Sequence, residues 1–174
     1  MDLERSIESV QLGKGRSGIV FLDCHPDGRQ VARKIFIDDP LARAANYFFS
    51  GAPAAYGWNE SAIKSAYYRR KILSDLVEYW FWDRLRVAEA SGFGWNEGQR
   101  AYEMETGFID GRYASLHHPF SGPNEKELGD LVANKMNPLQ DKLIESGFDG
   151  LVWQAGKGNP VAANNFMLQK GPSG

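Results

Sequence analysis

A glycine-rich turn joins two strand-like runs in the stretch VQLGKGRSGIVFL, residues 10–22. Its three glycines stand at positions 13, 15 and 18. Glycine adopts backbone conformations that other residues avoid, so this spacing predicts a flexible hairpin. A dinucleotide-binding fold needs a helix that opens at the third glycine, but the apolar run IVFL continues there as a strand. A Walker-type phosphate loop is also excluded, because no Gly-Lys-Ser/Thr closes the spacing.

The glycine hairpin is followed by a second turn and a third strand. HPDG at residues 25–28 predicts the turn, because proline presets its own backbone angle and glycine tolerates a positive φ. The run VARKIF at residues 31–36 is typical of a strand. This part of the chain therefore predicts three antiparallel strands joined by two hairpins.

A long helix is predicted over residues 59–82. Apolar residues recur there at steps of three and four, and Asn59 is suited to cap the first turn. Two further strands are predicted at about residues 86–90 and 101–106, with residues 92–98 as the connecting loop.

The last part of the chain predicts a second helical region. It covers residues 125–146, is loosened near Pro138, and stops at Gly147, a residue type that commonly ends helices. A short strand is predicted at residues 151–154. The order of strands and helices indicates a single α+β domain.

Composition and charge narrow the class of protein. The 174 residues are enough for one domain with a sizeable core, and 43% hydrophobic with 24% charged residues is an ordinary globular composition. The formal charge of -2 gives no electrostatic drive toward nucleic acid or an anionic membrane. Cys24, the single cysteine, cannot form an internal disulfide, and the first thirty residues show no secretory leader. We therefore expect a cytoplasmic protein with neither a nucleic-acid nor a membrane partner.

Two motifs in the predicted sheet resemble those of the protein-kinase-like superfamily. The glycine hairpin matches Gly-x-Gly-x-x-Gly-x-Val with Val20 in the last place, and the third strand matches Val-Ala-x-Lys with Lys34 as its lysine. The resemblance implies that ATP binds with its phosphates near Lys34 and with adenine between Val20 and Ala32. It also implies that the last strand of the sheet supplies backbone contacts to adenine. The nucleotide-binding residues implied in this way are Gly13, Lys14, Gly15, Gly18, Val20, Ala32, Lys34, Met104, Glu105 and Gly107.

A second segment, NPVAANNFML at residues 159–168, is similar to a kinase catalytic loop. Kinases carry an aspartate at the place of Asn159 and an asparagine at the place of Asn164. The resemblance implies Lys34 and Asn159 as catalytic residues, and Asn164 as a ligand of magnesium. The amide of Asn159 cannot accept a hydroxyl proton as a carboxylate does.

The chain departs from the kinase pattern in two further places. Kinases orient the strand lysine with a helix glutamate, but Arg69 holds that position here, so Glu60 or Glu78 would have to replace it. The surrounding cluster RRK at residues 69–71 is predicted to be a solvated helix face. The sequence also ends at Gly174 before any metal-binding aspartate of the Asp-Phe-Gly type, so we expect either a fragment or a reduced nucleotide-binding module.

The resemblance divides the chain into a kinase-like N-lobe, residues 1–110, and a partial helical C-lobe, residues 111–174. It implies that the N-lobe is a five-stranded antiparallel sheet with one long helix. It implies a phosphotransferase of unknown acceptor, such as a protein kinase, if a longer chain supplies the missing aspartate. The alternative is a catalytically inactive pseudokinase that acts as an interaction module. A remote third alternative is an ADP-ribosyltransferase-like domain, because GFDGLV at residues 147–152 resembles a strand of those folds.

The expected partners are a nucleotide and either another protein or a second copy of the chain. A partial second lobe is expected to leave an apolar helix face uncovered, and exposed apolar faces tend to associate. The residues of this face are Leu128, Leu131, Val132, Leu139 and Leu143.

Overall fold

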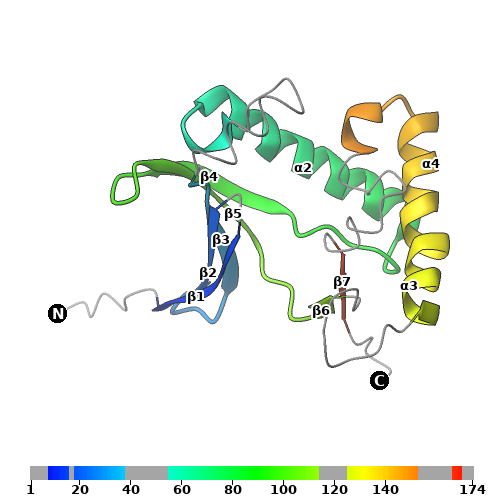
Figure 1. Ribbon diagram of the computed structural model, residues 1–174, viewed down its shortest axis with the longest axis horizontal. Helices are drawn as coiled ribbons and strands as arrows, with labels where there is room; N and C mark the ends of the chain where they lie inside the picture. Colours follow the sequence, from blue (N-terminus) through cyan, green and yellow to red (C-terminus); the bar gives the residue numbers. More distant parts are fainter. Residues whose placement is uncertain (1–7, 16–17, 38–54, 114–124, 153–165, 170–174) are drawn as a thin grey trace. The chain divides into compact units, whose positions relative to one another are not determined.

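The computed structural model describes residues 8–15, 18–37, 55–113, 125–152 and 166–169, which belong to two compact units (Figure 1). We call them the sheet unit and the helical unit. The sheet unit takes residues up to Leu76 and Val87–Phe108, and the helical unit takes Val77–Arg86 and the residues from Ile109 onward.

The sheet unit is built on five antiparallel strands in the order β1-β2-β3-β5-β4. This confirms the predicted five-stranded antiparallel sheet and the α+β class. β5 lies between β3 and β4, so it pairs along both of its edges. The strands are β1 (Glu8–Gly15), β2 (Gly18–Cys24), β3 (Gln30–Ile35), β4 (Ala90–Asn96) and β5 (Ala101–Gly107).

Both hairpins predicted for the first three strands are present. In the turn between β2 and β3, the Gly28 N–H donates to the His25 carbonyl oxygen at 2.9 Å. Gly28 has a φ of +84°, an angle that residues with a Cβ rarely adopt. The glycine of the HPDG turn is therefore required by the backbone.

β4 occupies most of the segment that the sequence predicts as a loop, residues 92–98, so that prediction is wrong. The strand predicted at residues 86–90 begins only at Ala90. Glycines in this segment suggest a loop, but its aromatic side chains find partners on β5. Trp95 stands opposite Tyr102, with the two ring centres 5.0 Å apart. Cross-strand pairs of this kind stabilise a strand that contains glycines.

The long helix α2 (Glu60–Phe81) forms as predicted. The Ala62 N–H donates to Asn59 Oδ1 at 3.1 Å, so Asn59 caps the first turn. A short 3-10 turn, η1 (Ala55–Gly57), precedes the helix, and the Tyr56 ring in this turn contacts a ring of the core.

The core of the sheet unit lies between α2 and one face of the sheet. Ile63 and Tyr67, one turn apart on α2, supply the helix side of this core. Its members, buried or partly buried, are Phe36, Ile63, Tyr67, Ala90, Phe93, Tyr102 and Met104.

The helical unit confirms the second predicted helical region and its loosened point. α3 (Glu125–Leu131) and α4 (Asn137–Glu145) are joined by a π-helical turn, η2 (Val132–Met136). Pro138 follows directly, and because its ring lacks an N–H and crowds the preceding turn, the helix widens there. Gly147 ends α4 with a φ of +75°.

The strand predicted at residues 151–154 is wrong at its start. The structure has a 3-10 turn, η3 (Asp149–Leu151), closed by a hydrogen bond from the Leu151 N–H to the Phe148 carbonyl oxygen at 2.9 Å. Residues 153–165 lie outside the described part of the chain. The ADP-ribosyltransferase-like alternative therefore gains no support from the described residues of this stretch.

The apolar face of the second helical region is buried, which corrects the expectation that it is left uncovered. Leu131, Leu139 and Leu143 are each at most 5% exposed. A short antiparallel pair, β6 (Arg112–Tyr113) and β7 (Met167–Leu168), accompanies the helices. The core around Leu131 contains Leu128, Leu131, Val132, Met136, Phe166 and Leu168.

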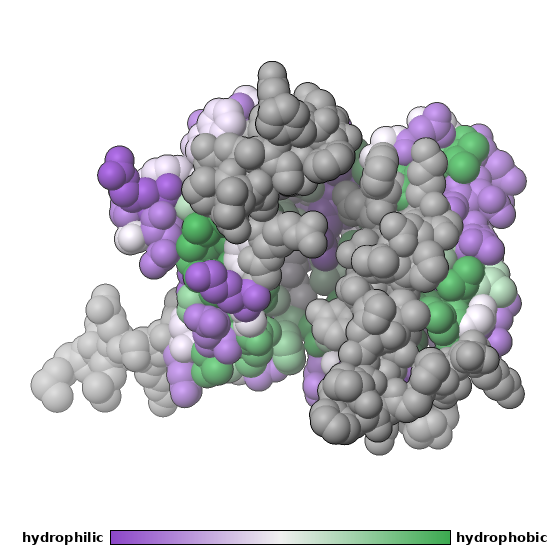
Figure 2. Space-filling model, in the orientation of Figure 1, coloured by the Kyte–Doolittle hydropathy of each residue, from purple (hydrophilic) through white to green (hydrophobic). Residues whose placement is uncertain are grey.

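Exposed apolar side chains are found instead along one face of α2. Tyr68, Ile72 and Tyr79 recur there at helical spacing, and Tyr79 is 84% exposed. Elsewhere on the described surface, hydrophobic patches lie among hydrophilic residues (Figure 2). None of the helices in the part of the chain that the structure describes combines the length and the apolar composition of a membrane span.

Candidate functional site

Three of the residues implied by the resemblance form one row across the sheet. Val20 of β2 lies opposite Lys34 of β3, and Lys34 lies opposite Met104 of β5. Residues directly opposite each other in antiparallel strands share a face of the sheet. Met104 belongs to the core under α2, so this row lies on the face that α2 covers.

Ala32 lies on the same face as this row. It stands two residues before Lys34 on β3, and alternate residues of a strand point to the same side. Its partner on β5 is Thr106, whose hydroxyl donates to the Ala32 carbonyl oxygen at 3.4 Å. The structure therefore brings Ala32 together with Val20 and Lys34.

Lys14 and Glu105 belong to the opposite face. Lys14 pairs with Ile19, the residue before Val20, and Glu105 pairs with Arg33, the residue before Lys34. Because neighbouring residues of a strand point to opposite faces of the sheet, Lys14 and Glu105 lie on the face opposite to Val20 and Lys34. The structure thus separates the side chains of these two predicted nucleotide-binding residues from the others.

The end of β5 already uses part of its backbone. The Gly107 N–H donates to the Glu89 carbonyl oxygen at 3.0 Å. Glu105 lies opposite residues of both β3 and β4. An adenine edge that binds here would have to use the backbone groups that these bonds leave available.

The glycine hairpin combines an open position with a crowded one. Gly13 lies opposite Val20, and a Cβ added there would meet no atom within 4 Å. Gly15 pairs with Gly18, and the two residues between them lie outside the described part. At Gly18 the φ is +142°, and an added Cβ would lie 2.0 Å from the Ile35 carbonyl oxygen. Gly18 is therefore required for the close approach of β2 to β3, whereas Gly13 leaves open space.

Lys34 carries a half-buried ammonium group. Its Nζ lies 5.0 Å from the centre of the Phe36 ring, where the ring face attracts a cation. Burial lowers the pKa of Lys34, and the nearby positive charge of Arg70 lowers it further.

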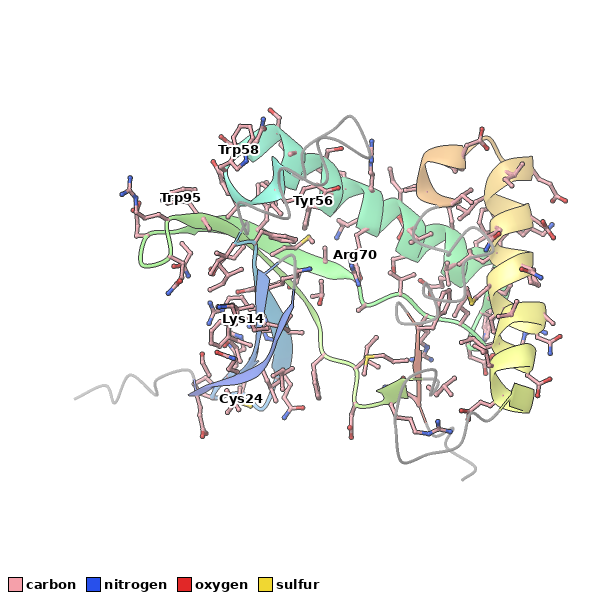
Figure 3. All side chains as sticks on the ribbon, viewed as in Figure 1. Lys14, Cys24, Tyr56, Trp58, Arg70 and Trp95 are labelled. Carbon is pink, nitrogen blue, oxygen red and sulfur yellow. The ribbon has the colours of Figure 1, made fainter. Side chains whose placement is uncertain are left out.

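Arg70 of α2 is a residue of this site that the sequence reasoning missed. The cluster at residues 69–71 is predicted to be solvated, and this is wrong for Arg70, which is half-buried. Its side chain on α2 is labelled in Figure 3. Its Nε–H donates to the Ala88 carbonyl oxygen at 2.6 Å, and burial lowers its pKa. The sequence does contain a signal that could have identified Arg70 as partly buried. Tyr67 and Arg70 belong to the same run of three- and four-residue steps, which places both on one face of the predicted helix.

The charge of α2 that acts on Lys34 is positive. Arg70 supplies it, whereas Glu60 and Glu78, the predicted substitutes for the kinase glutamate, are both exposed. Arg69, which holds the place of that glutamate in the sequence, is exposed as well. The site therefore has two neighbouring cations on β3 and α2.

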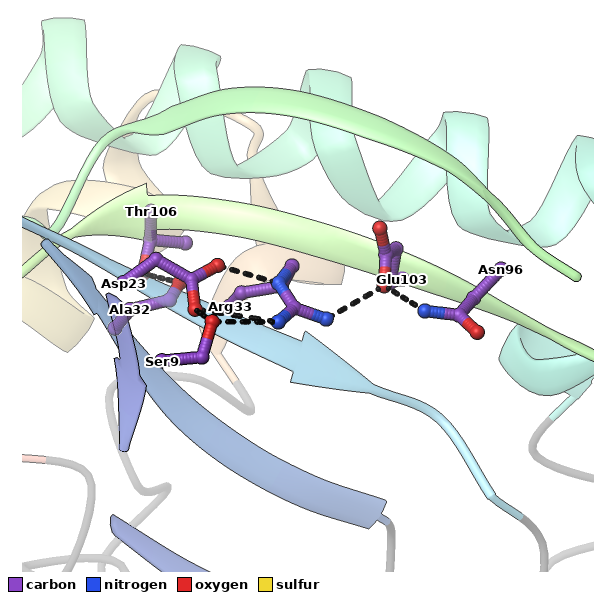
Figure 4. A network of polar contacts seen from close by, with 7 residues as sticks. All are labelled: Ser9, Asp23, Ala32, Arg33, Asn96, Glu103 and Thr106. Atoms are coloured by element: carbon purple, nitrogen blue, oxygen red, sulfur yellow. Dashed lines mark hydrogen bonds and ion pairs between the residues drawn. The ribbon is translucent and has the colours of Figure 1, made fainter. Parts of the chain in front are cut away.

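The opposite face of the sheet carries a polar network around Arg33 (Figure 4). Arg33 donates to Asp23 and to Glu103, with Nη1 3.1 Å from Glu103 Oε2. Burial raises the pKa of Asp23, but hydrogen bonds from Arg33 and Ser9 outweigh this and leave the pKa below 3.8. Asn96 Nδ2 donates to Glu103 at 2.8 Å. The buried charges are paired, so this network joins the strands and is not a vacant site.

The two predicted residues of the catalytic-loop segment, Asn159 and Asn164, lie outside the described residues. Within the residues that are described, no group of three or more histidine, cysteine, aspartate or glutamate side chains is placed to hold a metal ion.

Comparisons of the chain with protein-family models, with curated proteins and with solved structures find no match. The function is therefore inferred from the geometry of the site itself.

Proposed function

We propose that this chain is a kinase-like domain that binds ATP on the sheet face carrying Val20, Ala32 and Lys34. The observation that carries the proposal is the row of Val20, Lys34 and Met104 beside the glycine hairpin. It combines a half-buried ammonium with apolar side chains and with the open space at Gly13. A nucleotide offers the matching groups, an anionic polyphosphate and a flat base.

Each group has a separate task in this proposal. Lys34 pairs with phosphate oxygens as a compact positive charge, and Gly13 lets the hairpin backbone approach them. Val20 and Ala32 contact the two sides of the adenine ring. Backbone groups near Gly107 bind the edge of the ring, although the Gly107 N–H itself is already donated.

Magnesium binding and phosphoryl transfer are a separate matter. Asn164 is the proposed magnesium ligand, but one amide oxygen is not a sufficient donor set for this ion. Asn159 supplies no carboxylate that could accept a proton. We therefore propose ATP binding for this chain, and phosphotransferase activity for a longer chain that adds the missing carboxylates.

Calorimetric titration with ATP tests the binding proposal. Lys34→Ala should weaken binding about 10–100-fold, the value of one charge-assisted hydrogen bond. Gly13→Val should also weaken binding, because its side chain fills the open space at the hairpin. Lys71→Ala is the matched control, since it removes an exposed lysine that pairs with Glu89 2.8 Å away.

Circular dichroism confirms that each variant is folded before it is titrated. Wild type and Lys71→Ala should bind ATP equally well. Binding that is unchanged in Lys34→Ala would mean that the nucleotide lies elsewhere. A lack of binding at millimolar ATP would refute the nucleotide proposal for this chain.

The second candidate is a non-catalytic interaction module, as in a pseudokinase. It is favoured by exposed aromatic side chains at the end of α2: Tyr79 of the helix is 84% exposed, and Trp82, the residue that follows the helix, is 80% exposed. Light scattering distinguishes the candidates: wild type that self-associates and binds no ATP favours the module.

A further inference from the structure

One face of α2 carries a continuous row of exposed side chains. These residues follow one another at alternating steps of four and three, which places them on one line along the helix. Tyr68 is 52% exposed, Ile72 is 42% exposed and Tyr79 is 84% exposed, so apolar and aromatic surface lies along this line. We call this row the α2 stripe, and its residues are Ser61, Ser65, Tyr68, Ile72, Asp75 and Tyr79.

The α2 stripe lies on the side of the helix that is turned away from the sheet. Ile63 and Tyr67 supply the core of the sheet unit from the other side of α2. Ile63 and Ile72 are about two and a half helical turns apart, so their side chains point in opposite directions. The stripe is therefore separate from the sheet face that carries Val20 and Lys34.

The two halves of the α2 stripe differ in charge and in size. The basic side chains of Lys64 and Arg69 flank its first half, and the acidic side chains of Asp75 and Glu78 belong to or flank its second half. All four are exposed, and within the described part of the chain none of them has an ion-pair partner. The first half also begins with two small serines, whereas the second half ends with the large ring of Tyr79.

A second copy of the chain matches both differences when its α2 runs antiparallel to the first. If the two helices cross near Ile72, then the first half of each stripe faces the second half of the other. The basic side chains of one copy lie near the acidic side chains of the other, and the serines leave room for the opposite Tyr79 ring. A parallel pairing would place like charges beside each other, which is unfavourable.

We propose that this chain forms a symmetric dimer through the α2 stripe, with the two α2 helices antiparallel and crossing near Ile72. Alternating steps of four and three are the spacing with which helices pack side by side in coiled coils. A two-fold interface brings the same residue to the axis from both copies, so Ile72 contacts its own counterpart. One pair of helices makes a small interface, and the dimer therefore dissociates on dilution.

Sedimentation equilibrium over a range of protein concentrations tests this inference. Wild type should change from monomer to dimer as the concentration rises from micromolar to millimolar. Ile72→Glu places two carboxylates at the two-fold axis and should remove the dimer. Ile144→Glu is the matched control, because Ile144 is an exposed isoleucine of another helix, α4, and this variant should dimerise as wild type does. Circular dichroism confirms that each variant is folded.

Reversal of charge tests the antiparallel direction. Lys64→Glu combined with Arg69→Glu makes both halves of the stripe acidic. Asp75→Lys combined with Glu78→Lys makes both halves basic. Each double variant should weaken dimerisation at least about 10-fold, because several attractions between the copies become repulsions. The variant with all four changes should dimerise within about 3-fold of wild type, because reversing both halves restores the attractions.

Three results would overturn the proposal. Wild type that stays monomeric at millimolar concentration would leave the α2 stripe to a different protein. A dimer that persists in Ile72→Glu would use another surface. A quadruple variant that dimerises no better than the double variants would exclude the antiparallel charge match. The proposal does not rest on the nucleotide site, so Ile72→Glu should bind ATP as wild type does, and either property can fail without the other.

Discussion

Replacing Gly18 with alanine should destabilise the sheet unit strongly, whether or not a nucleotide binds. The added Cβ would lie 2.0 Å from the Ile35 carbonyl oxygen and 3.0 Å from the carbonyl carbon, whereas ordinary contact begins at 3.4 Å. Both atoms belong to the backbone, so β2 must move away from β3 before the methyl group fits. The φ of +142° adds strain for any residue that has a Cβ.

The expected loss follows from these two costs. Backbone strain of this kind costs about 1–3 kcal/mol, and an extra methyl group in a filled space costs about as much again. We therefore expect the free energy of unfolding to fall by about 3 kcal/mol. With a urea m-value of about 2 kcal/mol/M, the midpoint of unfolding should fall by about 1.5 M. Tryptophan fluorescence measures this transition, since Trp58 and Trp95 both belong to the sheet unit.

Two other glycines separate the two costs. Gly28→Ala introduces backbone strain but no steric overlap, because the φ of Gly28 is +84° and no atom lies within 4 Å of the added Cβ. This variant should lower the free energy of unfolding by about 1 kcal/mol. Gly13→Ala introduces neither strain nor overlap, so its free energy of unfolding should lie within about 0.5 kcal/mol of that of wild type. If Gly18→Ala unfolds at the same urea concentration as Gly28→Ala, then the close Ile35 carbonyl group is not the reason that position 18 requires glycine.

Two further predictions concern the polar network. Arg33→Met should lower the free energy of unfolding in urea by about 3–5 kcal/mol, because the buried Asp23 carboxylate loses its cation. Lys71→Met breaks an ion pair at the surface and should lower it by less than about 1 kcal/mol. Equal losses in the two variants would contradict this role of Arg33. The pKa of Asp23 is lowered from 3.8 by folding, so its stabilisation is complete above pH 3.8 and is lost as the pH falls through the folded-state pKa. The difference in unfolding free energy between wild type and Asp23→Asn should therefore narrow below pH 3.8, and a constant difference would exclude this role of the carboxylate.

Local signals in the sequence were sufficient for several elements. The glycine of HPDG has the positive φ that a tight turn requires, and Asn59 caps α2 with its own side chain. Pro138 loosens the second helical region because a missing N–H acts within one helical turn. Each of these effects arises among residues that are close together in the chain, so the sequence reveals them directly.

β4 shows where local signals fail. Its glycines indicate a loop when the segment is read by itself, and the partners that make it a strand lie on β5. The aromatic pair of Trp95 and Tyr102 is formed only when the two segments are already side by side. Strand propensity depends on such neighbours more than on the segment itself.

The sequence by itself determined β1, β2, β3 and β5 in outline, and the long helix α2 with its cap. Only the tertiary structure decided that the charge of Arg70 on α2 acts on Lys34. Helical spacing predicts which face of α2 is buried, but it does not predict which strand residues that face contacts. The tertiary structure also decided that Gly18 approaches Ile35 and that Arg33 joins Asp23 to Glu103, a residue 70 positions away. These contacts link distant parts of the chain, and their energies depend on distances that exist only after the sheet and the helix have packed together.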